Sequence, residues 1–221
     1  PPYLDLVVLR FRGESIQYKA LKSGAVLVDV DAGLAWDDLV SELVDRGIRG
    51  LENLSLIPGT VGAAPVQNIG AYGVELADVL DSVEVFNIEE GSVETFSKQQ
   101  CQFAYRDSIF KQNPNKYFIL KVRLIVSATR DFNFAYGGLQ SLNQQSEVSV
   151  SDVRKKVISL RQAKLPDPKA LPNAGSFFKN PIISVDECNR IKNKFPALVY
   201  YPLDAGKCKL AAGWMIDQLG W

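Results

Sequence analysis

The sequence predicts an α+β fold, because strand-like and helix-like segments follow one another without the regular strand–helix–strand alternation of a parallel α/β protein. Three stretches carry this prediction: a long apolar strand pattern at 117–126, an amphipathic helix pattern at 35–46, and an irregular stretch with Gly and Pro at 50–72. The chain has 221 residues and is 47% hydrophobic. This is enough to bury a core in one large domain or in two smaller ones.

The N-terminal part is expected to supply two strands and one helix. Segments 3–11 and 25–31 are rich in Val and Leu with alternating partners, which is typical of strands. Segment 35–46 has apolar residues at helical spacing, and Gly47 is a natural helix stop. The apolar residues on its common face are Leu39, Val40, Leu43 and Val44.

The middle of the chain is expected to form a hairpin followed by the strongest strand. Segments 82–88 and 92–96 flank a short Glu-Glu-Gly turn, and the pattern YFILKVRLIV at 117–126 is dominated by strand-favouring residues. Segment 140–152 is rich in Gln, Asn and Ser, so we expect a loop there.

Helices are expected in the remainder of the chain. Ser149 or Ser151 is suited to cap the first of them, because a Ser side chain can accept a hydrogen bond from a free backbone N–H. Its apolar face contains Val153, Val157 and Leu160. Two shorter helices are predicted at 186–194 and 209–219.

The composition argues against several kinds of function. Lys+Arg and Asp+Glu are both 25, so the net charge is zero, which argues against nucleic acid as a partner. The absence of His removes the imidazole metal ligand and every Ser-His-Asp scheme. Three widely spaced Cys predict neither a disulfide framework nor a zinc site, and favour reduced thiols in the cytosol. No apolar run approaches the roughly 20 residues of a membrane span.

The stretch 50–72, GLENLSLIPGTVGAAPVQNIGAY, is the most informative part of the sequence. Gly and Pro interrupt both helices and strands, so the stretch is suited to fold irregularly against a ligand, with bare backbone N–H groups pointing inward. Its two turns are expected at 58–62 and 68–73. Glycine-rich turns are also common in ordinary surface loops, and the glycines alone leave that alternative open.

Three strings together resemble one known family. They are the stretch at 50–72, FAYRDSIFK at 103–111 and LPDPKALPNAGSFFKNP at 165–181. They are similar to the UDP-N-acetylenolpyruvoylglucosamine reductases, flavoenzymes that make UDP-N-acetylmuramate for bacterial cell walls. The resemblance implies an oxidoreductase with FAD as cofactor and NADPH as hydride donor, which reduces UDP-N-acetylglucosamine enolpyruvate in peptidoglycan precursor synthesis.

The resemblance also bears on domain organisation. It implies a FAD-binding domain of the vanillyl-alcohol-oxidase-like (PCMH-type) fold, followed by part of an α+β substrate-binding domain. Composition alone would place the boundary near 140–152. The resemblance places it later, where the string LPDPKALP at 165–172 is stiff and breaks any helix. We therefore expect a FAD-binding domain at 1–165 and a substrate-binding domain at 166–221.

The resemblance assigns the cofactor to the stretch 50–72 and to one strand residue. Glycines there would let the flavin approach the backbone closely, and the Gln-Asn pair could hydrogen-bond its ring or ribityl chain. Family members often carry small hydroxyl residues where this chain has Ala, so only backbone donors are expected at those two positions. The implied cofactor-binding residues are Pro58, Gly59, Gly62, Ala63, Ala64, Gln67, Asn68, Gly70, Ala71, Tyr72 and Ile119.

Two catalytic residues follow from the same resemblance. Arg106, in the family's YRDS motif, is expected to hold and polarise the substrate carboxylate, because a fixed guanidinium suits a planar anion. Ser176 resembles the family's proton donor. The alternatives are that Arg106 is a structural residue paired with Asp107 or another acid, and that Ser176 caps a turn.

Substrate contacts are implied for Tyr136, Lys164 and Asn180, which would bind the nucleotide, a phosphate and a sugar or phosphate, respectively. No metal is expected. The family also has an N-terminal Gly-Ser-Asn phosphate loop and a third catalytic residue, a Glu near its C-terminus. The first is absent from this sequence, and the second would lie beyond residue 221. We therefore expect that the chain lacks the family's N-terminal and C-terminal portions.

Two other functions stay open at the level of the sequence. The chain could act only as a flavin- or nucleotide-binding module without turnover, or it could be another flavoprotein of the same cofactor-binding fold. The string at 173–181 argues against the second. We expect a cytoplasmic monomer that binds a small UDP-sugar, with neither nucleic acid nor a membrane as partner.

Overall fold

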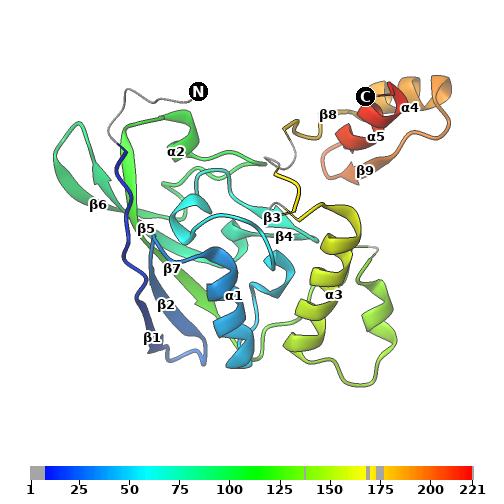
Figure 1. The fold of residues 1–221 in the computed structure, drawn as a ribbon. Helices are drawn as coiled ribbons and strands as arrows, with labels where there is room; N and C mark the ends of the chain where they lie inside the picture. The colour runs from blue at the N-terminus through cyan, green and yellow to red at the C-terminus, as the bar shows by residue number, and fades with distance from the viewer. Residues whose placement is uncertain (1–7, 137, 168–169, 173–176, 221) are drawn as a thin grey trace. The chain divides into compact units, whose positions relative to one another are not determined.

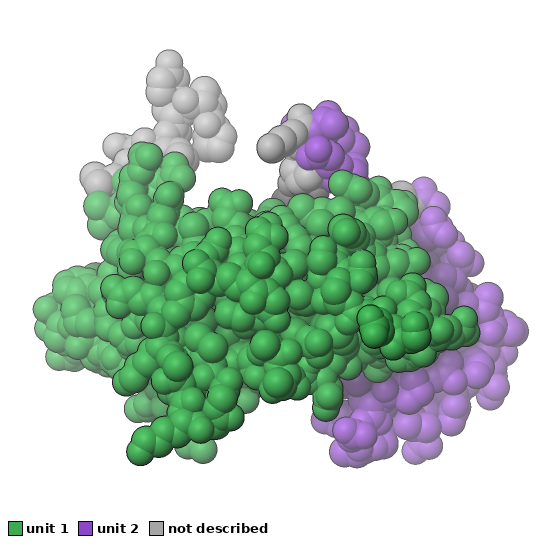
Figure 2. Space-filling view, turned by 90° about the horizontal axis from the view of Figure 1, so that it is seen from below, with its two compact units in different colours: residues 1–165 green, residues 166–221 purple. Residues whose placement is uncertain are grey.

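The computed structural model describes residues 8–136, 138–167, 170–172 and 177–220. The chain divides into two compact units, Pro1–Leu165 and Pro166–Trp221, which are coloured separately in Figure 2. Both units combine helices with antiparallel strands (Figure 1), so the predicted α+β class is confirmed. None of the described helices is long and apolar enough to cross a membrane.

The larger unit is built on a five-stranded antiparallel sheet with the strand order β1-β2-β7-β5-β6. The central strand β7 occupies Tyr117–Val126, the bounds that its residue pattern predicts. Val122, Leu124 and Val126 of β7 enter the core in alternation, while Arg123 on the other face bridges Asp29 and Glu84 at 2.7 Å each. The other strands are β1 Ile16–Ala20, β2 Val26–Asp31, β5 Leu80–Asn87 and β6 Ser92–Ser97.

Helix α1, Trp36–Asp45, packs over one face of this sheet (Figure 1). Its predicted apolar face is buried and joins the strand residues in a single core cluster. Trp36 is also buried, and its indole N–H donates to the Leu54 carbonyl at 2.9 Å. This bond fixes α1 to the irregular segment that follows it.

Helix α3, Val150–Lys164, is capped by Ser149 rather than Ser151. The Ser149 hydroxyl accepts from the Asp152 N–H at 3.1 Å, and the Asp152 carboxylate accepts from the Ser149 N–H, so the pair forms a capping box. Val153 and Val157 pack with Leu139 and Leu142 in a second, smaller cluster.

Short elements shape the rest of the larger unit. They include a two-stranded sheet, four 3₁₀ turns and one short helix. Their bounds are η1 Glu52–Leu54, η2 Val61–Ala63, β3 Gly70–Ala71, β4 Val74–Glu75, η3 Leu76–Asp78, α2 Ile109–Gln112 and η4 Gln140–Gln144.

The smaller unit has its own three-stranded antiparallel sheet, in the order β8-β10-β9, and its own core. That core consists of Cys188, Leu198, Cys208 and Leu210. The elements are β8 Ile182–Ser184, α4 Val185–Lys194, β9 Tyr200–Leu203, β10 Lys207–Leu210 and α5 Ala212–Gln218.

Three element predictions need correction. The described part of the predicted strand 3–11 has no regular structure, because Val8 and Leu9 are 72% and 78% exposed and pair with no described strand; the first strand of the described residues is β1. The predicted loop 140–152 contains η4 and the first turn of α3. The predicted helix 209–219 begins as strand, because Lys209 and Leu210 pair with β9, and α5 starts only at Ala212.

Candidate functional site

The predicted cofactor segment folds as short turns, 3₁₀ turns and strand β3, and it contacts the N-terminal end of α1 through the Trp36 N–H, which donates to the Gly59 carbonyl at 3.0 Å. Four of its predicted residues line a small recess: Pro58, Ala63, Ala64 and Gln67. Trp36, Ile57, Thr60 and Ile69 complete the wall. The recess is therefore formed by small and apolar side chains, with the exposed amide of Gln67 at its margin.

The backbone of this segment differs from the expected row of bare N–H groups. Four consecutive N–H groups, from Val61 to Ala64, donate to carbonyls of the protein at 2.9–3.2 Å. Two of those acceptors, Ala32 and Leu34, belong to the connection between β2 and α1. The Val61 and Gly62 donors hold the turn to that connection, and the Ala63 and Ala64 donors are used within the turn, so the expectation that backbone donors at Ala63 and Ala64 remain for a cofactor is not supported by the geometry.

Asn68 and Ile119, two further predicted cofactor residues, are buried. The Asn68 amide donates to Glu75 at 2.8 Å and to the Ala104 carbonyl at 3.3 Å, and its Oδ1 accepts from the Ala77 N–H at 3.0 Å. Ile119 is part of the core cluster on β7. Asn68 therefore holds the segment by hydrogen bonds, and Ile119 packs in the core.

Arg106 joins two of the three recognised strings. Its guanidinium donates to the carbonyl oxygens of Gly70 and, at 3.4 Å, of Asn68, and it lies 3.7 Å from the Glu75 carboxylate. A Cβ atom at Gly70 would lie 2.8 Å from Arg106 Nη1, so this approach requires glycine. The acid that pairs with Arg106 is Glu75, because Asp107 instead accepts from the Ser108 N–H at 3.0 Å.

Sequence reasoning missed Ser108, the residue that fixes the YRDS turn. Ser108 is fully buried, and its hydroxyl donates to the Val66 carbonyl at 2.6 Å while accepting from the Lys111 N–H at 3.2 Å. One side chain thus caps α2 and tethers the turn to the cofactor segment. The signal was present, since a Ser at a helix start is a common cap.

Three further predicted residues lie close to one another. The rings of Tyr72 and Tyr136 are edge to face with centroids 4.9 Å apart, and Lys164 Nζ lies 5.9 Å from the Tyr136 centroid. Burial raises the pKa of Tyr72, with Arg161 acting in the opposite direction, so the phenol is a hydrogen-bond donor at neutral pH. Residues from three separate segments form this cluster, which we call the tyrosine cluster: Tyr72, Tyr136, Arg161 and Lys164.

Arg161 is the second residue that sequence reasoning missed. Burial lowers its pKa, and among the described residues its side chain makes neither an ion pair nor a hydrogen bond. It stands one helical turn before Lys164, so both cations extend from the same side of α3. A half-buried guanidinium with no hydrogen bond to the described part of the chain favours an anion. The i, i+3 spacing of the two basic residues was the signal available in the sequence.

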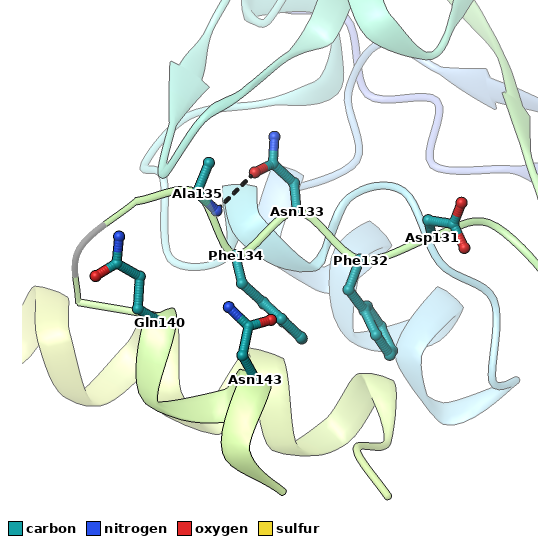
Figure 3. A pocket seen from close by; sticks show the side chains of 7 residues that line it. All are labelled: Asp131, Phe132, Asn133, Phe134, Ala135, Gln140 and Asn143. Carbon is teal, nitrogen blue, oxygen red and sulfur yellow. Dashed lines mark hydrogen bonds between the residues drawn. The ribbon is translucent and has the colours of Figure 1, made fainter. Parts of the chain in front are cut away.

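An open hollow borders this region on the stretch that leads to Tyr136. Figure 3 shows its lining, where the Ala135 N–H donates to Asn133 Oδ1 at 3.0 Å. Its lining residues are Asp131, Phe132, Asn133, Phe134, Ala135, Gln140 and Asn143. None of the predicted site residues lines it.

The remaining predicted residues lie elsewhere. Ser176 falls outside the described residues. Asn180 belongs to the smaller unit, where its Oδ1 accepts from the Ala212 N–H at 2.9 Å and anchors the start of α5. No group of three or more His, Cys, Asp or Glu side chains that could hold a metal ion occurs in the part of the chain that the structure describes.

The sequence is similar to a known domain family and to known reductases. Residues 5–97 match the FAD binding domain family. The chain is 47% identical over 221 residues to the UDP-N-acetylenolpyruvoylglucosamine reductase of Pseudomonas aeruginosa, covering 99% of this chain and 65% of the relative. The corresponding protein of Neisseria gonorrhoeae is 44% identical over 219 residues, covering 97% and 63%. The chain thus spans about 65% of the length of the first of these relatives.

One solved structure is also similar. The crystal structure of UDP-N-acetylenolpyruvylglucosamine reductase from Thermus caldophilus matches with a TM-score of 0.56 and 26% sequence identity, over 87% of this chain and 53% of that one. Together with the match to the FAD binding domain, this likeness confirms the predicted fold class.

Proposed function

Because this chain is homologous to the UDP-N-acetylenolpyruvoylglucosamine reductases over nearly all of its length, we propose that it provides the FAD site and part of the substrate site of such an enzyme. The reaction is the NADPH-driven reduction of UDP-N-acetylglucosamine enolpyruvate to UDP-N-acetylmuramate for peptidoglycan. The larger unit is the FAD-binding domain, and the smaller unit is part of the substrate-binding domain. The observation that carries the proposal is the contact of Arg106 with the Asn68 and Gly70 carbonyls, which unites two motifs of the family.

The recess at 57–69 fits part of a flavin. Its wall of Pro58, Ala63 and Ala64 offers apolar contact at small side chains, and Gln67 supplies an amide at the margin. FAD, when bound, supplies hydride transfer between NADPH and substrate. The protein residues provide the binding surface and its orientation.

Arg106 is suited to the substrate's carboxylate. Its guanidinium carries five N–H donors, and the two carbonyls and Glu75 fix its orientation without using all of them. A held cation next to the reacting carbons would stabilise the charge that develops on the carboxylate during reduction. Ser176 would then donate a proton to the neighbouring carbon, as its motif implies.

The tyrosine cluster is suited to a nucleotide diphosphate. Arg161 and Lys164 offer two positive charges on one side of α3, and the Arg161 side chain makes neither a hydrogen bond nor an ion pair with the described residues, although the Asp37 charge acts on it. Tyr136 adds an aromatic face, and the Tyr72 phenol adds a donor. The UDP part of the substrate would therefore bind there. Soluble substrates of this kind support a cytoplasmic location, and we propose a monomer.

The first experiment is an equilibrium titration of the purified chain with FAD, followed by flavin fluorescence. We expect saturable binding, and we expect Ala63→Leu to weaken it at least tenfold because the larger side chain fills the recess. Ala128→Leu is the matched control, because Ala128 is exposed and lies outside the recess. A folded chain that does not bind FAD would contradict the proposed cofactor site.

The second experiment is an assay of NADPH oxidation that depends on UDP-N-acetylglucosamine enolpyruvate. Turnover by this chain supports the reductase function directly. FAD binding without turnover supports the alternative, in which this polypeptide by itself is a cofactor- and nucleotide-binding module.

A further inference from the structure

The turn between β3 and β4 has an unusual residue at its first position. Tyr72 and Gly73 both have positive φ, at 50° and 81°, and they join the two short strands. Two-residue hairpin turns of this kind favour Asn or Gly, because a side chain is strained in the left-handed region. Tyr72 therefore keeps this backbone conformation only if its surroundings hold it there.

Two asparagine side chains hold both carbonyls of this turn. Asn53 Nδ2 donates one hydrogen to the Tyr72 carbonyl at 2.8 Å and the other to the Asn133 carbonyl at 2.9 Å. Asn133 Nδ2 in turn donates to the Gly73 carbonyl at 2.8 Å. The close approach of Asn133 also explains the glycine, since a Cβ atom at Gly73 would lie 3.2 Å from the Asn133 amide.

The same two side chains also fix the stretch that carries the second tyrosine. Asn53 holds the Asn133 carbonyl, and Asn133 Oδ1 accepts from the Ala135 N–H at 3.0 Å, as Figure 3 shows. Ala135 is followed directly by Tyr136. The hydrogen bonds of Asn53 and Asn133 therefore converge on both partners of the 4.9 Å ring contact between Tyr72 and Tyr136.

The burial of Asn53 indicates that its two donors matter. Asn53 is 1% exposed, and its Oδ1 has no hydrogen-bond partner among the described residues. A buried acceptor without a partner costs free energy. An apolar side chain would avoid that cost but would leave the Tyr72 and Asn133 carbonyls without their donor.

We propose that Asn53 and Asn133 are positioning residues, which hold the strained Tyr72–Gly73 turn and the 133–136 stretch so that Tyr72 and Tyr136 form one edge of a nucleotide diphosphate subsite. This inference rests on the proposed function of the tyrosine cluster. It adds two residues to that function, because neither asparagine belongs to the tyrosine cluster. Their effect on a ligand would pass through the placement of the two rings.

The test combines UDP titration by calorimetry with a direct measurement on the rings. The chain is labelled with fluorotyrosine, and its ¹⁹F resonances are assigned with Tyr72→Phe and Tyr136→Phe. We expect Asn53→Ala and Asn133→Ala each to shift both resonances and to weaken UDP binding about tenfold. Because both variants disturb one network, the double variant is expected to lose less affinity than the two single losses multiplied together.

Asn87→Ala is the matched control for the loss of a buried asparagine. Asn87 is 4% exposed, and its side chain bonds Glu94 and the turn after β5, outside the tyrosine cluster. We expect it to lower the unfolding midpoint comparably and to leave UDP affinity and both resonances unchanged. A general loss of stability would affect all three variants alike, whereas a positioning role affects only Asn53 and Asn133.

The outcomes separate this inference from the function on which it rests. Absence of UDP binding by the unaltered chain would refute the nucleotide subsite itself. If the unaltered chain binds UDP, and folded Asn53→Ala and Asn133→Ala bind it equally well with unshifted resonances, the positioning role is wrong and the subsite stands.

Discussion

At the scale of single residues, Arg106 has a structural task beside its proposed chemical one. It has φ of 53°, a strained value for a side chain of its size, and its guanidinium reaches across to carbonyls of the cofactor segment. The sequence placed Arg106 in a motif but could not show what it touches, because those contacts join residues that are 36 and 38 positions apart.

We predict that Arg106→Ala lowers the free energy of unfolding by about 1–2 kcal/mol, because hydrogen bonds from a charged group are lost and the side chain is only partly exposed. FAD affinity should fall as well, since the Gly70 turn loses its anchor. Urea denaturation followed by the fluorescence of buried Trp36 measures the first effect. Lys98→Ala, a change at an exposed turn, is the control. Unchanged stability and FAD affinity would leave Arg106 with no role in holding the segment.

At the scale of elements, α3 is fixed to α1 by one bidentate pair. Arg154 donates to the two Asp37 oxygens at 2.7 and 2.9 Å, and Asp37 Oδ1 also accepts from the Leu56 N–H at 2.6 Å. Because Arg161 and Lys164 lie further along α3, this pair fixes the helix on which the proposed phosphate ligands are placed.

The Asp37–Arg154 pair gives stability a defined dependence on pH. Burial of Asp37 acts to raise its pKa, but the hydrogen bonds from Arg154 and the Leu56 N–H outweigh burial, so the pKa lies below its ordinary value of 3.8. The contribution of the ionised Asp37 carboxylate to the free energy of unfolding is therefore complete above about pH 4. It is lost as the pH falls through the lowered folded-state pKa. We predict that Asp37→Asn costs about 1–3 kcal/mol at pH 7 and progressively less at lower pH. Urea denaturation of both proteins from pH 7 to pH 3 measures this, and a difference that is constant with pH would contradict it.

Elements with long periodic patterns were predictable, and short elements were not. The sequence placed β7 at its observed bounds and α1 within one residue of them, because ten or more residues reveal a period of two or 3.6. Strands β8 and β9 have three and four residues, too few for alternation to show. The described part of the predicted strand 3–11, residues 8–11, failed for a different reason, because favourable residues form a strand only where another strand pairs with them.

At the scale of the whole molecule, the sequence predicted the α+β class, but not how the segments of the candidate site are held together. The two asparagines belong to no pattern that stands out along the chain, and Ser108 and Arg161 left only weak signals, a cap position and a basic pair at i, i+3. Their roles appear only when distant segments meet, as with Asn53 and Asn133. The two units nevertheless have separate cores. The larger core contains one free cysteine and the smaller core two, and their reactivity can report on each core.

The thiols allow the stability of the two units to be compared within one protein. Cys101 is buried in the large core, where burial raises its pKa to about 12, while Cys188 and Cys208 are buried in the small core. A small core removes less apolar surface from water and so contributes less stability. We predict that Cys188 and Cys208 become reactive at a lower urea concentration than Cys101. Pulses of iodoacetamide at increasing urea, with each cysteine peptide quantified by mass spectrometry, measure this order. Labelling rates in full denaturant provide the reference, and simultaneous exposure of all three thiols would mean that the two units unfold as one.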